Sequence, residues 1–153
     1  MIDAAAAASL DRYENFKFQV TVDGLPLTGV SKISALKRTT DVIQHRQGGD
    51  PTSSQKEPGL TRYAAITLQR GLTSDRAFEQ WADQVSKLNG TPGANFRKDA
   101  SIELLDYAGN PVLKYIVHRC WVSEYVALPD LDADTDSVAF ESITLENEGW
   151  ERG

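Results

Sequence analysis

The stretch GLTRYAAITLQRGLTSDRAFEQWADQV, residues 59–85, combines the two periodicities on which the fold depends. Its first part is rich in β-branched and aromatic residues, which is typical of a strand. Thr73 or Ser74 can cap a following helix, and Asp75 suits the positive end of the helix dipole. Apolar residues then recur at helical spacing, at Phe78, Trp81, Ala82, Val85 and Leu88. We therefore predict a strand, a turn and one helix over about 73–89, with no nucleophile elbow, phosphate loop or metal-ligand spacing.

The segments on either side of this stretch alternate between apolar and polar residues, as half-buried strands do. In the first, Phe16, Phe18, Val20 and Val22 share one face. A second hairpin is expected over residues 101–125, with its turn at 108–111. The strand after this turn is apolar on both faces, with Leu113, Tyr115 and Val117 on one side and Ile116, Cys120 and Val122 on the other. Such a strand should be covered on both sides, by a second layer or by another subunit.

Together these patterns predict a mainly β (α+β) fold, a small antiparallel β-barrel or sandwich with one flanking α-helix. The length of 153 residues fits a single domain over 1–153. The helix is expected to cover one face or end of the sheet; a partner-binding helix is the alternative. The residues predicted to form the core are Phe16, Phe18, Phe78, Trp81 and Val85.

Composition excludes several classes of function. The net charge of −6 provides no surplus of Lys and Arg to neutralise phosphates, which argues against sequence-specific nucleic-acid binding. No apolar run reaches the roughly 18 residues of a membrane span, so no membrane anchor is expected. The single cysteine, Cys120, gives no sign of an oxidising compartment. Residues 1–12 lack the basic region of a signal peptide, so we expect a cytoplasmic protein whose N-terminal arm orders on contact with a partner.

The segment QHRQGGDPTSSQKEPGL, residues 44–60, is polar and rich in Gly, Pro and Ser. Loops of this length inside a compact domain are uncommon and are usually functional or disordered. We predict an extended loop here, either a surface loop or an arm that orders on a neighbouring subunit.

A run of acidic residues resembles a calcium-binding loop in its spacing. Asp130, Asp132, Asp134, Asp136 and Glu141 fall at positions 1, 3, 5, 7 and 12 of an EF-hand count. Position 6 is Thr135, where the EF-hand turn needs a glycine, and the flanks look like strands. The run is therefore a weak metal candidate, with a solvated acidic loop as the alternative.

The remaining titratable residues form no convincing catalytic set. The only histidines, His45 and His118, lack ligands at metal-binding spacing. A dyad of His118 and Cys120 lacks a third, orienting group. A cluster of carboxylates near the end is predicted to consist of surface charges, at Glu141, Glu146, Glu148 and Glu151. We expect no enzyme activity and no cofactor.

Because the sequence contains no convincing catalytic or metal site, we turn to its resemblance to a known family. DRYENFKFQVTVDG, residues 11–24, resembles the opening strand of the phage tail tube family, the inner tube proteins of contractile phage tails and of related bacterial contractile injection systems. GVSKISALKRTTDVIQHRQGGD, residues 29–50, resembles the second strand pair and a glycine-containing arm. The most specific match is KEPGLTRYAAITLQRGLTSD, residues 56–75. Residues 99–152, ending in Glu148, Gly149, Trp150 and Glu151, resemble the C-terminal hairpin and last strand.

The resemblance implies a structural protein that forms hexameric rings, which stack into a hollow tube. It implies a sheath protein, a baseplate and a tube-terminating protein as partners, and effector or DNA cargo in the lumen. The particle would assemble in the cytoplasm and become part of a phage tail or tail-like particle. The implied inter-subunit contacts lie in the predicted loop, at Gln47, Gly48, Gly49, Asp50, Pro51, Lys56, Glu57, Pro58 and Gly59.

The sequence leaves three questions about function undecided. The sequence does not decide between a phage tail and an injection system, although its length is typical of the latter. A baseplate-proximal tube adaptor of the same fold is a second possibility. A monomeric calcium-binding β domain is the alternative from a different class.

Overall fold

A computed structural model describes residues 17–45, 55–87, 96–134 and 138–153. These residues contain ten strands and one helix. In chain order they are β1 (Lys17–Val22), β2 (Leu25–Leu27), β3 (Val30–Ile33), β4 (Arg38–His45), β5 (Gln55–Tyr63), β6 (Ile66–Gly71), α2 (Ala77–Ser86), β7 (Lys98–Leu105), β8 (Pro111–Val126), β9 (Phe140–Glu146) and β10 (Trp150–Arg152). The prediction of a mainly β chain with one helix is confirmed.

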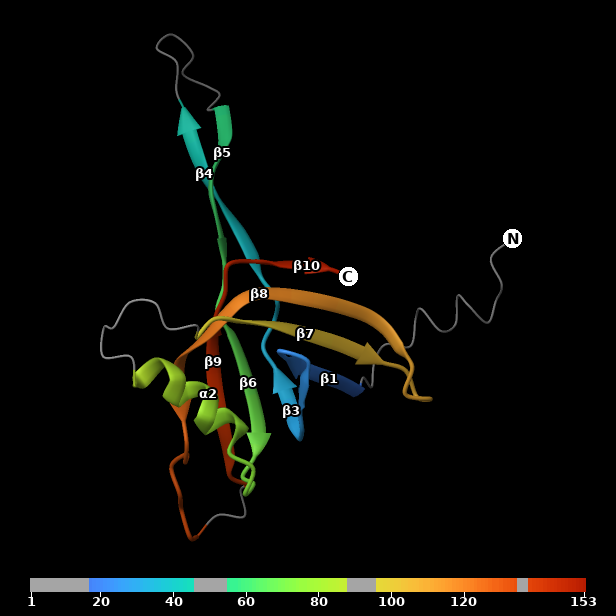
Figure 1. Ribbon diagram of the computed structural model, residues 1–153. Coiled ribbons are helices and arrows are strands. Elements are labelled where there is room, and N and C mark those ends of the chain that lie inside the picture. The colour runs from blue at the N-terminus through green and yellow to red at the C-terminus, as the bar shows by residue number, and fades with distance from the viewer. Residues whose placement is uncertain (1–16, 46–54, 88–95, 135–137) are drawn as a thin grey trace.

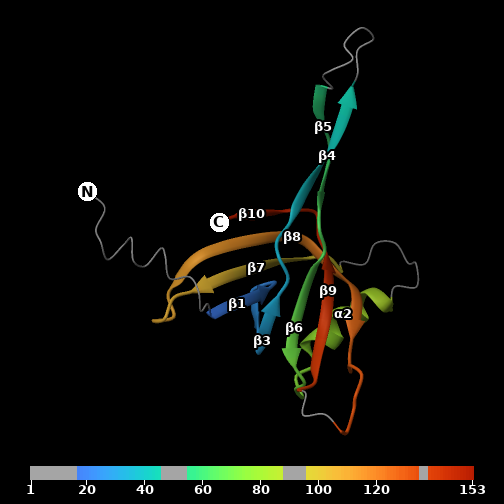
Figure 2. The same cartoon turned by 180° about the vertical axis from the view of Figure 1, so that it is seen from behind.

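The body of the molecule is one antiparallel sheet that bends around a core (Figures 1 and 2). Its strand order is β2-β1-β7-β8-β9-β6-β3, and β10 pairs with β8. The long strand β8 belongs to both halves, since it pairs with β7 along its first part and with β9 along its second. The two end strands, β2 and β3, do not pair with each other. The result is a sandwich-like arrangement rather than the closed barrel that was the other option.

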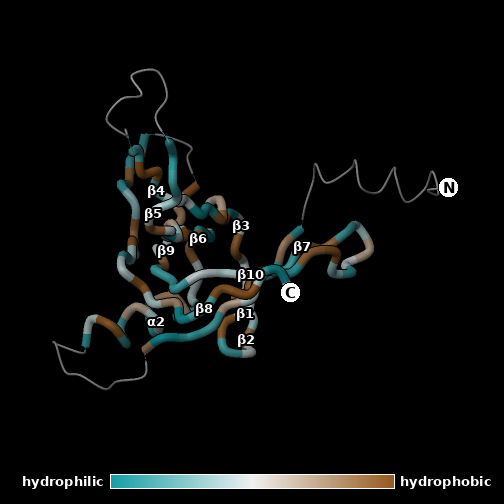
Figure 3. The backbone as a smooth tube through the Cα atoms, turned by 90° about the horizontal axis from the view of Figure 1, so that it is seen from above, coloured by the Kyte–Doolittle hydropathy of each residue, from teal (hydrophilic) through white to brown (hydrophobic). Residues whose placement is uncertain are grey.

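The strands bury one face, as their alternating sequences require. Val20 and Val22 of β1 are buried and Phe18 packs against the core, which confirms that face of β1; Phe16 lies outside the described residues. In β9, Ile143 and Leu145 point into the core. Apolar segments of the chain trace also run along β7 and β8 (Figure 3).

The prediction of which β8 residues share a face is wrong for one pair of residues. Val117 and Cys120 were assigned to opposite sides, yet both are buried in the same core. Arg119 takes a left-handed backbone conformation, with φ of 52°, and the pairing with β7 shifts between Lys98 and Ala100. This is a β-bulge, in which one extra residue reverses the alternation of the strand.

The helix is shorter than predicted. It begins at Ala77, not near residue 73, and neither Thr73 nor Ser74 caps it. Asp75 accepts a hydrogen bond from the Ala77 backbone N–H at 3.2 Å, while its own carbonyl accepts one from Arg70. Arg70 thus holds the backbone of Asp75 in place two residues before the helix begins. The described helix ends at Ser86, and the predicted stop at residues 89–90 lies outside the described residues.

The helix packs on β8 and contributes the large aromatic residues of the core. Phe78 and Trp81 are buried as predicted, and Val85 at the edge is half-buried. Within the described residues, no helix has the length and apolar character needed to cross a bilayer.

Replacing Trp81 by alanine should lower the free energy of unfolding by about 3–5 kcal/mol, because the indole is only 4% exposed and its loss leaves a cavity. Urea unfolding followed by circular dichroism measures the change. Trp81→Phe is the matched control: the indole Nε1 has no hydrogen-bond partner, so its loss removes no hydrogen bond. An alanine variant as stable as the phenylalanine variant would mean that this helix face is not part of the core.

Candidate functional site

Strands β4 and β5 form a two-stranded hairpin that projects from the body of the molecule (Figures 1 and 2). They pair with each other along their lengths, from Arg38 opposite Tyr63 to His45 opposite Gln55. No other described strand pairs with either of them. A two-stranded ribbon is marginally stable on its own in water. Among the described residues, this hairpin is therefore the segment that we most expect to be stabilised by contact with another molecule.

The structure corrects the loop predicted over residues 44–60. Its last part is strand: Gln55 to Leu60 belong to β5, because β4 supplies an antiparallel partner for them. Predicted interface residues Lys56, Glu57, Pro58 and Gly59 thus lie on the projecting hairpin. Gln47, Gly48, Gly49, Asp50 and Pro51 lie outside the described residues.

The two faces of the hairpin differ in chemistry. One face carries the ion pair of Asp41 with Arg62 at 3.0 Å and the contact of the His45 ring with the Glu57 carboxylate at 3.3 Å. Both pairs are exposed, so each contributes at most about 1 kcal/mol. On the other face Val42 lies opposite Pro58 in the pairing register, and the Val42 residue is 63% exposed. Ile43 and Leu60 are also exposed, so the projecting ribbon carries several exposed apolar residues, which favours contact with another molecule.

The base of the hairpin is fixed by an aromatic cluster around Trp150 of β10. Tyr63 and Tyr115 meet its ring edge-on, with centroids 5.8 and 5.9 Å away. The Arg38 guanidinium lies over the ring at 5.7 Å. Gly149 has φ of 127°, and a Cβ there would lie 3.3 Å from the Tyr63 ring, so only glycine fits. The Glu-Gly-Trp motif in the sequence therefore anchors the hairpin to the body.

An open apolar groove of about 460 Å³ lies beside this cluster. It is lined by Phe18, Ile33, Leu36, Ile102, Leu104, Tyr115 and Trp150. None of these side chains is charged. The groove and the face of the hairpin that carries Val42 meet at the contact between Trp150 and Tyr63.

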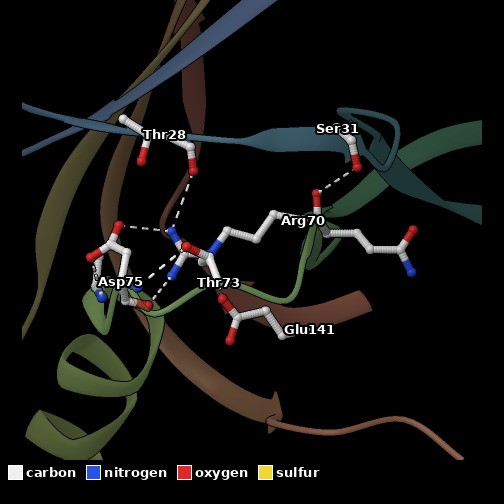
Figure 4. Close-up of polar contacts among 8 residues, drawn as sticks. Thr28, Ser31, Arg70, Thr73, Asp75 and Glu141 are labelled. Atoms are coloured by element: carbon white, nitrogen blue, oxygen red, sulfur yellow. Dashed lines mark hydrogen bonds and ion pairs between the residues drawn. The ribbon is translucent and has the colours of Figure 1, made fainter. Parts of the chain in front are cut away.

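The most polar buried feature is Arg70 of β6, which is 1% exposed (Figure 4). Its guanidinium donates to Glu141 of β9, to the Asp75 carboxylate at 3.0 Å and to the Asp75 carbonyl at 2.9 Å. It also donates to the carbonyl of Thr28, in the turn between β2 and β3, at 3.3 Å. The guanidinium stacks over Phe78 of the helix at 4.1 Å. One side chain thus joins two strands, the β2–β3 turn and the helix.

The charge of Arg70 has a measurable consequence for its partner. Its hydrogen bond to Asp75 is the largest cause that holds the pKa of that carboxyl below its ordinary value. The aspartate thus stays ionised, so it can both accept from Arg70 and accept from the helix N–H of Ala77.

Sequence reasoning missed the pair of Arg70 and Glu141, although a signal was present. Arg70 occupies the third inward position of β6, after Ile66 and Leu68. Glu141 occupies an inward position of β9, before Ile143. A charged residue on the apolar face of a strand needs a buried partner of opposite charge, so each of these two positions indicated a buried ion pair.

The weak calcium candidate is not assembled by the described residues. The prediction that Glu141 is a surface charge is wrong: it is buried and points inward to Arg70. Asp130 and Asp132 line a surface hollow together with Phe140 and Ser142, which point to the opposite face of β9. Asp134 is exposed and Asp136 lies outside the described residues. Among described residues no group of three or more His, Cys, Asp or Glu side chains could hold a metal ion.

The histidine and the cysteine of β8, His118 and Cys120, lie in different environments and form no common site. His118 contacts Glu151 of β10 at 3.1 Å on the surface. Cys120 is fully buried, and burial raises the pKa of its thiol to about 12. The bulge at Arg119 separates the two side chains, so the geometry gives them no shared site.

Comparisons with known proteins agree with this architecture. A family profile described as T4-like virus tail tube protein gp19 matches residues 14–151. No curated protein matches the chain. A chain of the cryo-EM structure of an extracellular contractile injection system, the PVC sheath–tube complex in the extended state, superposes with a TM-score of 0.80 at 21% identity, covering 100% of this chain and 99% of that one.

Two further structures share the fold. A chain of the 6-fold symmetrised anti-feeding prophage (AFP) baseplate gives a TM-score of 0.74 at 20% identity, covering 90% of this chain and 91% of that one. Hcp1 from Flavobacterium johnsoniae gives 0.52 at 17% identity, with coverages of 89% and 94%. Since the family profile spans nearly the whole chain, this protein belongs to the T4-like virus tail tube protein gp19 family.

Proposed function

We propose that six copies of this chain close into a ring and that the rings stack into the hollow inner tube of a contractile injection system or phage tail. A sheath protein surrounds the tube, a baseplate nucleates it and a tube-terminating protein ends it. Sheath contraction drives the tube through a target envelope, and effector or DNA cargo passes through its lumen. The particle assembles in the cytoplasm. The chain performs no catalytic step, which fits its membership of a structural tube family.

The observation that carries this proposal is the projecting β4–β5 hairpin, which no other described strand covers. A two-stranded ribbon that has no supporting strand and exposes apolar side chains is only marginally stable in a monomer. A head-to-tail contact from such a ribbon to a neighbouring copy generates either a closed ring or an open stack. Unpaired sheet edges at β2 and β3 would be covered in the same assembly.

A baseplate-proximal adaptor is the second candidate, favoured by the likeness to a chain of the AFP baseplate structure. An adaptor would form single rings, because only one of the two stacking faces of its ring would bind the tube, and the other would bind a different protein. A tube protein would stack its own rings.

Negative-stain electron microscopy of the purified protein tests these functions. We expect six-fold rings and hollow tubes that persist when calcium is chelated. Single rings at all protein concentrations would favour the adaptor. A monomer whose melting temperature falls on chelation would contradict the tube function and favour a calcium-binding domain built on the Asp130–Asp134 loop.

A further inference from the structure

We propose that the Val42 face of the β4–β5 hairpin of one copy docks into the apolar groove of a second copy. The inference rests on the proposed function, since it names the two surfaces that meet when copies assemble. The groove is the one lined by Phe18, Leu36, Trp150 and their neighbours, with a volume of about 460 Å³. This is within the size range of clefts that enclose a small ligand or a few side chains.

Matching chemistry selects this pair of surfaces. No charged side chain lines the groove. On the hairpin, Val42 lies opposite Pro58, and the same face also carries Gln44 opposite Lys56. The opposite face carries Ile43 between the pairs of Asp41 with Arg62 and of His45 with Glu57. Docking the ion-paired face would desolvate four charged or polar side chains against apolar groove walls. Docking the Val42 face removes the apolar surface of Val42 and Pro58 from water, and it brings Gln44 and Lys56 to the groove in place of those four side chains.

Geometry directs the contact to a second copy. The hairpin leaves the body at Tyr63, which touches Trp150 at the rim of the groove, and then projects away from it (Figure 1). Val42 therefore cannot reach back into the groove of its own chain. The two surfaces are different patches of one molecule, so pairing them between two copies is heterologous. One copy of the pair keeps a free groove and the other keeps a free hairpin. That is the property that a repeating assembly requires.

Site-specific cross-linking of the full chain tests the contact. One preparation carries Val42→Cys and the other carries Leu36→Cys, and the two are mixed with a short bis-maleimide. Docking places one thiol beside the other at a millimolar effective concentration, so mixed dimers should form about tenfold faster or more than at random encounter in micromolar solutions. The native Cys120 does not interfere, because it is fully buried and its thiol has a pKa of about 12.

Ile43→Cys mixed with Leu36→Cys is the matched control, because Ile43 is the next residue on the same strand and points to the opposite face. Equal rates for the Val42 and Ile43 probes would overturn the proposal. So would cross-linking of Val42→Cys chiefly to itself, which indicates a symmetric contact. A Leu36→Cys thiol that alkylates only after residues 1–16 are deleted would show that the chain's own leading segment fills the groove, and would also overturn it.

Microscopy of the same mixtures separates this inference from the proposed function. Tubes without selective cross-linking would refute the docking contact and leave the tube function intact. Selective cross-linking without rings or tubes would support the contact and contradict the tube function.

Discussion

Removing the outer part of the β4–β5 hairpin should abolish tubes and leave a folded monomer. The change deletes residues 41–60 and joins Thr40 to Thr61 through Asn-Gly. These two threonines lie opposite each other in register and their hydroxyls are 2.9 Å apart, so a two-residue turn can close the shortened ribbon. Among the described residues, the deleted part of each strand pairs only with the deleted part of the other, and the exposed ion pair of Asp41 with Arg62 is lost with it. An exposed pair contributes at most about 1 kcal/mol, so we expect the circular dichroism spectrum and the unfolding midpoint of the body to change little.

The shortened variant keeps Arg38 and Tyr63, which pack on Trp150, so the groove retains its rim. Electron microscopy and sedimentation velocity then report assembly. Loss of every ring and tube is the expected result, because the hairpin is the surface that reaches a neighbouring copy.

A milder deletion is the control. It replaces residues 46–54 by Asn-Gly between His45 and Gln55, which are also opposite each other in register. Assembly by this control would place the contact on the strands rather than on residues 46–54. Normal tubes from the longer deletion would contradict the role of the hairpin altogether.

Replacing Arg70 by methionine should destabilise the fold by about 3–5 kcal/mol, because Glu141 is then left as a buried charge without a partner. The carbonyls of Thr28 and Asp75 lose their donor in the same step. Thermal and urea unfolding give the size of the effect. We also expect the β2–β3 turn and the start of the helix to exchange amide hydrogens faster, since Arg70 is the residue that joins them.

The double variant Arg70→Met with Glu141→Leu tests the reason for that loss. Replacing both partners of a buried ion pair by apolar residues of similar volume is often neutral or stabilising. The double variant should therefore be more stable than Arg70→Met alone. If both variants are equally unstable, the packing of the guanidinium on Phe78 and its hydrogen bonds to carbonyls outweigh the unpaired charge. A single variant within about 1 kcal/mol of the parent would contradict the buried placement of Arg70.

Several features of the fold follow from local sequence patterns. The alternation of Val20 and Val22, and the helical spacing of Phe78 and Trp81, predicted which faces are buried. The turn before β8 was predicted from its Gly and Pro residues, and Gly109 takes φ of 87° there. Local patterns succeed in these cases because a strand or helix that buries one face needs apolar residues at a fixed period.

The errors occurred where a neighbour overrides the local pattern. Residues 55–60 contain Pro58 and Gly59, which indicate a loop, but β4 supplies hydrogen-bond partners that hold them in a strand. The helix begins at Ala77, after Asp75, whose side chain and carbonyl both accept from Arg70, and nothing near Thr73 in sequence reveals that contact.

The sequence by itself determined the class of fold, the apolar faces and the resemblance to the tube family, because each depends on residue types at short, regular spacings. Tertiary structure decided that Arg70 and Glu141, which lie 71 positions apart, share one buried ion pair. It also decided that the β4–β5 hairpin projects from the body and that an uncharged groove lies at its base. These features are set by which distant strands pair and how the sheet bends, and a one-dimensional pattern specifies faces without specifying partners.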